Sequence, residues 1–263
     1  MILYFSATGN SRSAAWRLGR LLGEDTMSIF DVAPQQVEMT GTTLGFVFPI
    51  YSWGVPPIVT EYVRRLNRKF VEAAILHSVW IVATCGDDVA MAPEMMKAAL
   101  NEAGLCLTGG WSLQMPNTYV LLPGFDVDSD ELALHKLIAS ETRLAEIAGR
   151  IFHKRWEESY VRGSWPRLKS AVVFPIFKKF GIFPSRWHAD DSCVGCGRCA
   201  ASCQIGNIAM KRVDGRRHPS WGANCISCLA CYHVCPYHAV QYGKITRRKG
   251  QYLNGGNDEK IEM

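Results

Sequence analysis

The sequence lacks the features of a protein that is exported or inserted in a membrane. No apolar run reaches the roughly 18 to 20 residues that a helix needs to span a bilayer. No basic segment precedes the short apolar stretch at the N-terminus, so no secretory signal is indicated. We therefore expect a cytoplasmic protein, whose ten cysteines bind metal rather than form disulfides, because that compartment keeps thiols reduced.

Two common nucleotide-binding motifs are also absent. The chain has neither the Gly-x4-Gly-Lys-Ser/Thr loop of nucleotide triphosphatases nor the Gly-x-Gly-x-x-Gly fingerprint of dinucleotide-binding folds. Because nothing else in the sequence suits a nicotinamide cofactor, we do not expect NAD(P)H to react with this protein directly. No proton-shuttling triad and no open metal site are evident, so the sequence identifies no catalytic residue.

The composition suits one or two globular domains. With 263 residues, 48% of them hydrophobic, the chain is long and apolar enough to bury real cores. The net charge of +5 is mild, and we expect no nucleic-acid partner. The basic excess lies in residues 150–190, which hold nine lysines and arginines against three acidic residues. This stretch is also rich in aromatic residues, so residues 151–190 are expected to form a linker that packs between modules.

Apolar segments alternate with helical patterns through residues 1–150. The expected strands are residues 2–5, 27–32, 43–49, 78–84 and 105–115, and the expected helices are residues 10–22, 56–68, 90–103 and 130–156. Several of these strands are apolar throughout, as expected for strands that are covered on both faces. The pattern predicts an α/β fold with a doubly wound, five-stranded parallel sheet.

Eight of the ten cysteines form two copies of one pattern near the C-terminus. Each copy reads Cys-x2-Cys-x2-Cys-x3-Cys, and they comprise Cys193, Cys196, Cys199 and Cys203, then Cys225, Cys228, Cys231 and Cys235. A [4Fe–4S] cluster takes three thiolates from one tight loop and a fourth from elsewhere. Zinc ribbons use ligands in pairs and have no use for four cysteines within eleven residues, twice. The repeat therefore predicts two [4Fe–4S] clusters.

The fourth cysteine of each run belongs to the other cluster in two-cluster ferredoxins. By this rule one cluster takes Cys193, Cys196, Cys199 and Cys235, and the other takes Cys225, Cys228, Cys231 and Cys203. Residues 191–242 resemble the bacterial ferredoxins, including Pro236 after the last cysteine, and Asp214-Gly215 indicates a hairpin turn between the runs.

Gln204 departs from the ferredoxin pattern, because the first run has proline at this position in that family. Glutamine restores a backbone N–H that proline lacks. Hydrogen bonds toward cluster sulfur raise the reduction potential. We therefore expect the cluster bound by Cys203 to be slightly more oxidising than its twin.

The two remaining cysteines lie outside the repeat. Cys106 falls in an expected buried strand and is predicted to be a small core residue. Cys85 ends a strand at the edge of the sheet where ligands bind, so it either packs in the core or contacts a ligand.

Three loops follow carboxyl ends of the expected strands, which is where open α/β sheets bind ligands. Residues 6–11 (Ser-Ala-Thr-Gly-Asn-Ser) offer hydroxyls, a glycine and the N–H groups of a helix start. These groups suit a phosphate, although many such loops are plain helix caps. Residues 49–54 carry Tyr51 and Trp53, which either stack on a flat ring system or pack within the loop. Residues 84–88 offer backbone groups beside Gly86.

The order of these motifs resembles the flavodoxin–ferredoxin fusion family of anaerobic bacteria and archaea. The segments FSATGNS, FVFPIYSWGVPP and MPNTY (115–119) precede the two cysteine runs, and the resemblance spans nearly the whole chain. It implies FMN, with its phosphate held by Ser6, Thr8, Gly9, Asn10 and Ser11. It also implies flavin-ring contacts from Tyr51, Ser52, Trp53, Gly54, Cys85 and Gly86, and a further one from Asn117. Ordinary flavodoxins often have an aromatic residue in the third loop, which this chain lacks.

The residue patterns and the resemblance together predict four regions and an electron-transfer function. The regions are a flavodoxin-like domain (1–150), the basic linker (151–190), a ferredoxin-like domain (191–242) and a tail (243–263) that we expect to be loosely held. Flavins exchange one or two electrons and each cluster exchanges one. The chain is therefore expected to relay electrons between a ferredoxin-type donor and an acceptor enzyme.

Two other functions and three roles for the linker stay open at this point. The protein could instead be a terminal reductase of a quinone, nitro compound or metal centre, or a redox sensor. The linker is a connector, a docking surface for an acidic redox partner, or a weak membrane-surface contact through residues 170–184. The sequence does not determine the oligomeric state.

Overall fold

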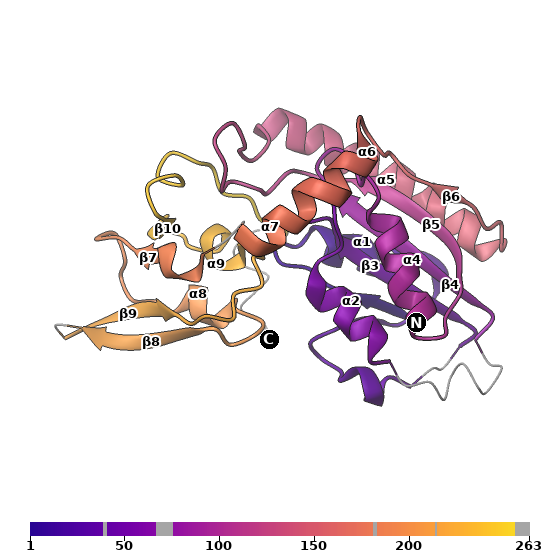
Figure 1. The fold of residues 1–263 in the computed structure, drawn as a ribbon, viewed down its shortest axis with the longest axis horizontal. Coiled ribbons are helices and arrows are strands. Elements are labelled where there is room, and N and C mark those ends of the chain that lie inside the picture. Colours follow the sequence, from indigo (N-terminus) through magenta and orange to yellow (C-terminus); the bar gives the residue numbers. More distant parts are fainter. Residues whose placement is uncertain (39–40, 67–75, 181–182, 214, 256–263) are drawn as a thin grey trace. The chain divides into compact units, whose positions relative to one another are not determined.

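The computed structural model describes residues 1–38, 41–66, 76–180, 183–213 and 215–255 (Figure 1). By their contacts the residues group into two compact units. Unit 1 comprises Met1–Ser6, Asn10–Pro116 and Asp130–Lys178, and unit 2 comprises Ala7–Gly9, Asn117–Ser129 and Lys179–Met263. Each unit combines segments that are far apart in the sequence. The expected domains, by contrast, are consecutive stretches of the chain, and their boundaries stay predictions.

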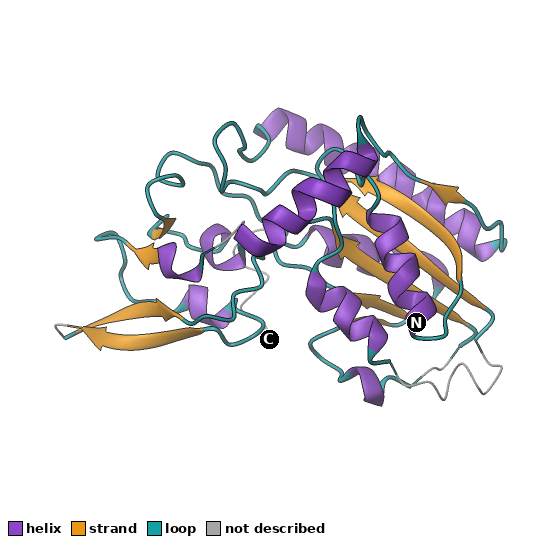
Figure 2. Ribbon diagram, viewed as in Figure 1, coloured by secondary structure: helices purple, strands orange, loops and turns teal. Residues whose placement is uncertain are grey.

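Unit 1 is built on one parallel sheet (Figure 2). Its strands are β1 (Ile2–Tyr4), β2 (Thr26–Ser28), β3 (Thr43–Pro49), β4 (Ser78–Cys85), β5 (Leu107–Gln114) and β6 (Glu158–Ser159), in the order β2-β1-β3-β4-β5-β6. The first five follow the 2-1-3-4-5 order of the flavodoxin-like fold, so the predicted fold class is confirmed. The sheet has six strands rather than five, because the two-residue β6 pairs with the edge strand β5.

Helices connect these strands, because parallel neighbours require a crossover. They are α1 (Asn10–Leu22), α2 (Pro57–Arg64), α4 (Ala92–Glu102) and α5 (Asp130–Phe152), with the 3-10 turn η1 (Pro34–Gln36). Helix α1 packs with α5, and α2 packs with α4. Leu18 and Ile147, from α1 and α5, meet Trp80 and Trp111 of the sheet in one buried cluster. Gly45 is required in this core, since a Cβ there would lie 2.2 Å from the Trp80 ring.

Much of the expected linker packs on unit 1. Beyond β6 the chain forms α6 (Pro166–Leu168), the π-helical segment η2 (Lys169–Val173) and α7 (Phe174–Phe180). Arg162 binds both carboxylate oxygens of Glu94, at 2.9 and 2.6 Å, and Lys169 forms an ion pair with Asp88 at 2.6 Å. Residues up to Lys178 therefore belong to the flavodoxin-like unit.

Unit 2 contains two small antiparallel sheets. Strands β7 (Trp187–Ala189) and β10 (Val240–Tyr242) pair with each other, and β8 (Ile208–Val213) pairs with β9 (Arg216–Trp221). Short helices η3 (Pro184–Arg186), α8 (Arg198–Ala201) and α9 (Ala230–His233) complete it. The predicted hairpin is confirmed, with Gly215 at φ +77°; Asp214 lies outside the described residues.

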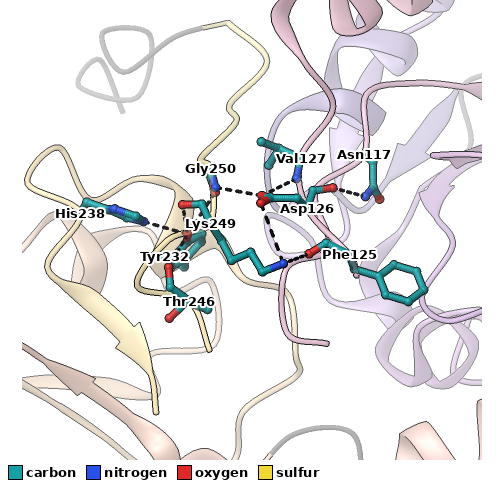
Figure 3. Close-up of polar contacts among 9 residues, drawn as sticks. All are labelled: Asn117, Phe125, Asp126, Val127, Tyr232, His238, Thr246, Lys249 and Gly250. Carbon is teal, nitrogen blue, oxygen red and sulfur yellow. Dashed lines mark hydrogen bonds and ion pairs between the residues drawn. The ribbon is translucent and has the colours of Figure 1, made fainter. Parts of the chain in front are cut away.

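The described part of the tail is firmly bound, which corrects the expectation of a loose segment. The Lys249 ammonium donates to the Phe125 carbonyl at 2.6 Å, and the Gly250 N–H donates to Asp126 at 2.8 Å (Figure 3). The Tyr232 hydroxyl lies 2.8 Å from the Lys249 carbonyl and 2.8 Å from Nε2 of His238. The tail therefore packs against residues 117–129 within unit 2. Among the described residues, no helix has the length and apolar character needed to cross a bilayer.

Candidate functional site

The two cysteine runs share one backbone conformation. Three positions in each run have a positive φ, and each pair is 32 residues apart. The pairs are Gly195 (+70°) with Ser227 (+62°), Gly197 (+82°) with Leu229 (+61°), and Gly206 (+63°) with His238 (+51°). Glycine adopts this conformation freely, whereas other residues are strained in it. The second run therefore keeps the same local backbone conformation without glycine.

One group of thiols lines a pocket in unit 2. Its cysteines are Cys193, Cys196 and Cys199 of the first run and Cys235 of the second. Burial raises the pKa of the Cys199 thiol to about 11, and the neighbouring thiols of Cys235, Cys193 and Cys196 raise it further. The structure thus brings together the four residues predicted to bind one cluster.

The other four cysteines form a second group. Burial raises the pKa of the Cys228 thiol to about 12, and the nearby thiols of Cys225 and Cys203 act in the same direction. Burial also raises the pKa of Cys231, and the thiols of Cys228 and Cys225, with Cys199 of the first group, act in the same direction. A thiol with a raised pKa stays protonated without metal, and a bound metal displaces that proton. The eight cysteines therefore gather as two crossed sets of four, and their role as ligands stays a prediction.

Backbone N–H groups point at the sulfur atoms and suit the cluster chemistry. The N–H of Asn207 donates to Cys203 Sγ at 3.2 Å, and that of Ala239 donates to Cys235 Sγ at 3.3 Å. Donors of this kind stabilise a thiolate ligand, so the cysteine sets fit iron–sulfur clusters. In the described part of the chain, no three or more His, Cys, Asp or Glu side chains converge on one point to hold a single metal ion.

The predicted phosphate loop is divided between the two units. In unit 1 the side chain of Asn10 donates to the Pro116 carbonyl at 2.9 Å, and the Ser11 hydroxyl lies 2.8 Å from that of Thr84. These side chains therefore tie the loop to the ends of β5 and β4. Ser6 is buried in the same unit. The N–H groups at the start of α1 are the atoms that suit a phosphate there.

The rest of this loop meets the tail within unit 2. The Asn254 N–H donates to the Thr8 carbonyl at 2.8 Å. Gly9 has φ +98°, and a Cβ there would lie 2.3 Å from the Asn254 carbonyl oxygen. Glycine is therefore required at this position for two reasons. The sequence analysis missed Asn254, because a polar, glycine-rich tail carries no signal of a specific contact.

The second predicted loop is a tight, strained turn. Tyr51 and Gly54 exchange two backbone hydrogen bonds, at 2.9 and 3.0 Å, while Ser52 and Trp53 have φ values of +46° and +64°. Such strain persists only where the surroundings fix it, and it is frequent at ligand sites.

Residues 169–174 of the expected linker contact this turn. Lys169 Nζ lies 5.0 Å from the Trp53 ring centroid, a cation–π distance. The Ser170 hydroxyl donates to the Trp53 carbonyl at 2.7 Å and accepts from the Met91 N–H at 2.9 Å. The Phe174 ring fills the space beside Gly54, where a Cβ would lie 2.4 Å away. The sequence analysis missed these residues; the only signal was the apolar and basic pattern of residues 169–174.

The cysteines outside the repeat differ from each other. Cys85 is buried at the end of β4, and its Sγ lies 3.9 Å from the Leu113 carbonyl. Burial raises its pKa to about 12, so its thiol is neutral. Next to it Gly86 is half-buried. The prediction for Cys106 is wrong: this residue is exposed, because β5 begins only at Leu107.

Asn117 closes a further loop, residues 117–128, by hydrogen bonds within it. Its side-chain amide donates to the Asp126 carbonyl at 2.6 Å (Figure 3). Its backbone N–H donates to Asp128 at 2.9 Å. The next residue, Thr118, offers its carbonyl to Nε2 of His233 at 2.8 Å. His233 follows Cys231 by two residues, so the second cysteine run touches the loop predicted to reach the flavin.

A family model described as a 4Fe-4S dicluster domain matches residues 192–240. The NAD-dependent dihydropyrimidine dehydrogenase subunit PreA of Escherichia coli (strain K12) is 41% identical over 63 residues, which is 23% of this chain and 15% of that protein. The same subunit of Escherichia coli O157:H7 gives the same values. This chain therefore spans only about a seventh of the length of these curated relatives, at 15%.

Solved structures with flavodoxin-like names also match at low similarity. A putative flavoprotein from Bacteroides uniformis is 18% identical with a TM-score of 0.34, over 43% of this chain and 88% of that one. The flavodoxin of Streptococcus pneumonia TIGR4 is 14% identical with a TM-score of 0.31, over 56% of this chain and 97% of that one. At such values the fold assignment rests on the strand order.

Proposed function

We propose that this chain, a fusion of a flavodoxin-like module with a ferredoxin-like 4Fe-4S domain, is an iron–sulfur flavoprotein that relays electrons between two [4Fe–4S] clusters and one FMN. The observation that carries the proposal is the gathering of eight cysteines into two crossed sets of four. FMN is supported by the loops after β1, β3 and β4, which lie at the carboxyl edge of a flavodoxin-like sheet.

The residues of this chain bind and tune the groups that carry the electrons. When bound, FMN exchanges one or two electrons and each cluster exchanges one. The cysteine thiolates hold the clusters, and the N–H groups of Asn207 and Ala239 stabilise their negative charge. The start of α1 offers N–H groups to the FMN phosphate. The raised pKa of Cys85 would keep its thiol uncharged at the sheet edge predicted to bind the flavin.

The packing around Trp53 favours a relay over a terminal reductase. Lys169, Ser170 and Phe174 all contact the turn at residues 51–54, so part of the expected linker packs against the loop predicted to clasp the flavin ring. A substrate of the reductase would need open access to that ring. A carrier needs only electron exchange through the protein. We therefore propose a cytoplasmic carrier whose partners are redox proteins, a ferredoxin-type donor and an acceptor enzyme.

Anaerobic purification with metal and flavin analysis tests the proposal. We expect about eight irons and one FMN per chain, since each cluster holds four irons. An EPR-monitored titration should then resolve three redox centres. Zinc in place of iron, or the absence of released flavin after denaturation, would overturn the proposal. Rapid multiple turnover with a quinone or nitro compound and no protein partner would favour the terminal reductase instead.

A further inference from the structure

The hairpin of β8 and β9 borders the pocket of the first cysteine group. Met210 and Pro219 face each other in register, and both line the pocket. Side chains two residues apart on a strand point to the same face. Arg212 and Arg217, which also pair with each other, therefore lie on the pocket face.

Arg217 reaches over the cysteine loop itself. A Cβ on Gly195 would lie 2.6 Å from the Arg217 carbonyl oxygen, and one on Gly197 would lie 3.9 Å from an Arg217 guanidinium nitrogen. Gly197 directly follows Cys196, so the Arg217 guanidinium lies beside the backbone of the first cysteine run. The hairpin therefore packs against the loop of the first cysteine run through Arg217.

The hairpin has a basic charge without visible compensation. Lys211, Arg212, Arg216 and Arg217 are all exposed, and Arg212 lies directly opposite Arg217. Like charges directly opposite destabilise a hairpin. None of the ion pairs found among the described residues involves any of these four. Asp214, the one acid in the hairpin sequence, lies outside the described residues.

Apolar side chains surround the mouth of the same pocket. Val194 is 60% exposed and Tyr237 is 52% exposed, and both line it together with Arg198. Asp190 and Asp191 precede the first cysteine but do not line the pocket. An apolar centre with a charged rim is the usual anatomy of a protein–protein interface. Here the apolar residues Val194 and Tyr237 line the same pocket as the four cysteines of the first group.

We infer that this surface docks an acidic one-electron carrier protein, which exchanges electrons with the cluster predicted at Cys193, Cys196, Cys199 and Cys235. The inference rests on the proposed function. In each transfer one electron leaves the reduced centre of the partner and enters this cluster, with no bond made and no proton moved. Nucleic acid or an anionic membrane would also fit the charge. A redox partner is favoured because the basic hairpin borders a pocket lined by four predicted cluster ligands.

Stopped-flow reduction by a reduced acidic [2Fe–2S] ferredoxin tests the inference on the anaerobic holoprotein. The rate constant should fall as salt rises, because screening weakens the attraction. The double variant Arg212→Glu with Arg217→Glu should lower the low-salt rate about tenfold or more, since steering of this kind changes on-rates by roughly 10 to 1,000-fold. The matched control, Arg20→Glu with Arg155→Glu, changes the same charge at exposed sites in unit 1 and should change the rate less than about twofold.

Three further measurements keep the outcomes distinct. Iron content and cluster potentials show whether each variant still holds its clusters. If the glutamate double variant loses iron, the milder double variant Arg212→Gln with Arg217→Gln replaces it. Reduction by the methyl viologen radical cation should not slow in the arginine variants, because this donor is itself positive.

Equal slowing in the control variant, or an unchanged ferredoxin rate, overturns the inference. Hairpin-dependent binding to DNA or anionic vesicles with an unchanged ferredoxin rate also overturns it, and assigns the charge to another partner. Both results leave the proposed function in place as long as iron and FMN are found. Loss of the proposed function would instead appear as missing iron or flavin in the unchanged protein.

Discussion

The two cysteine runs have the same loop conformation in different settings. The first run has glycine at all three left-handed positions, leads into the basic hairpin, and leaves Cys196 exposed. The second run has ordinary residues there, and Tyr232 beside its third cysteine is fully buried. A left-handed position can thus be filled by glycine, or by a residue that surrounding contacts hold in place. The first run keeps an exposed cysteine next to the basic hairpin, whereas the second run has a buried centre.

Among the changes that test this comparison, removal of the fourth cysteine of a run is expected to have the largest effect. Cys235→Ser should lower the iron content from about eight to about four per chain, because one cluster loses a ligand. Iron analysis and EPR would measure this. The remaining EPR signal should match that of Cys193→Ser and differ from that of Cys225→Ser.

The exposed Cys106 of unit 1 gives the control for this loss. Cys106→Ser should keep all the iron. If Cys235→Ser instead gave the spectrum of Cys225→Ser, each run would bind its own cluster and the crossed assignment would be wrong.

Tyr232→Phe tests the interior of the second run. The change removes a buried hydroxyl that contacts His238 and the tail carbonyls, so we expect a loss of about 1–3 kcal/mol in the free energy of unfolding. Anaerobic urea unfolding followed by circular dichroism measures it. Tyr237→Phe, at an exposed tyrosine five residues away, should change the free energy by less than about 0.5 kcal/mol. Equal effects at both positions would show that the network does not stabilise the fold.

Exchanging residues at one left-handed position should give changes of opposite sign. Gly195→Ala introduces a strained φ and a contact with Arg217, so we expect a loss of about 1–2 kcal/mol or more. Ser227→Gly at the matched position relieves strain but raises the entropy of the unfolded chain, so a gain of at most about 1 kcal/mol is expected. Thermal unfolding of both variants measures the pair, and a loss of similar size in each would contradict the comparison.

Gln204→Pro is expected to have the smallest effect. Proline removes an N–H next to Cys203, so the potential of the cluster that this cysteine binds should fall slightly. Pro236→Gln makes the reverse change in the second run and should raise the potential of the other cluster. Potentiometry on both variants checks the two directions. Unchanged potentials would remove Gln204 as a source of difference between the clusters.

The features predicted from the sequence are those with a local and repeated signal. Continuous apolar runs gave the central strands, and the cysteine spacing gave both sets of four. Strand β6 was missed because Glu158 and Ser159 carry no apolar pattern, and only the adjacent edge of β5 makes them a strand. The tail was misjudged because its contacts are hydrogen bonds from polar residues to a loop about 120 residues earlier in the chain. Such long-range polar contacts leave no periodic signal.

The interleaving of the two units bears on how the chain can be cut. Unit 2 takes Asn117–Ser129 from the middle of the flavodoxin-like sequence, and Val120 and Leu121 of that segment are buried in its core. In a fragment that ends before residue 179, these two side chains would be exposed to solvent. In the C-terminal fragment alone, their absence would leave a cavity in the core of unit 2. During synthesis on the ribosome, Val120 and Leu121 can therefore be buried only after the last cysteines of the chain have been made.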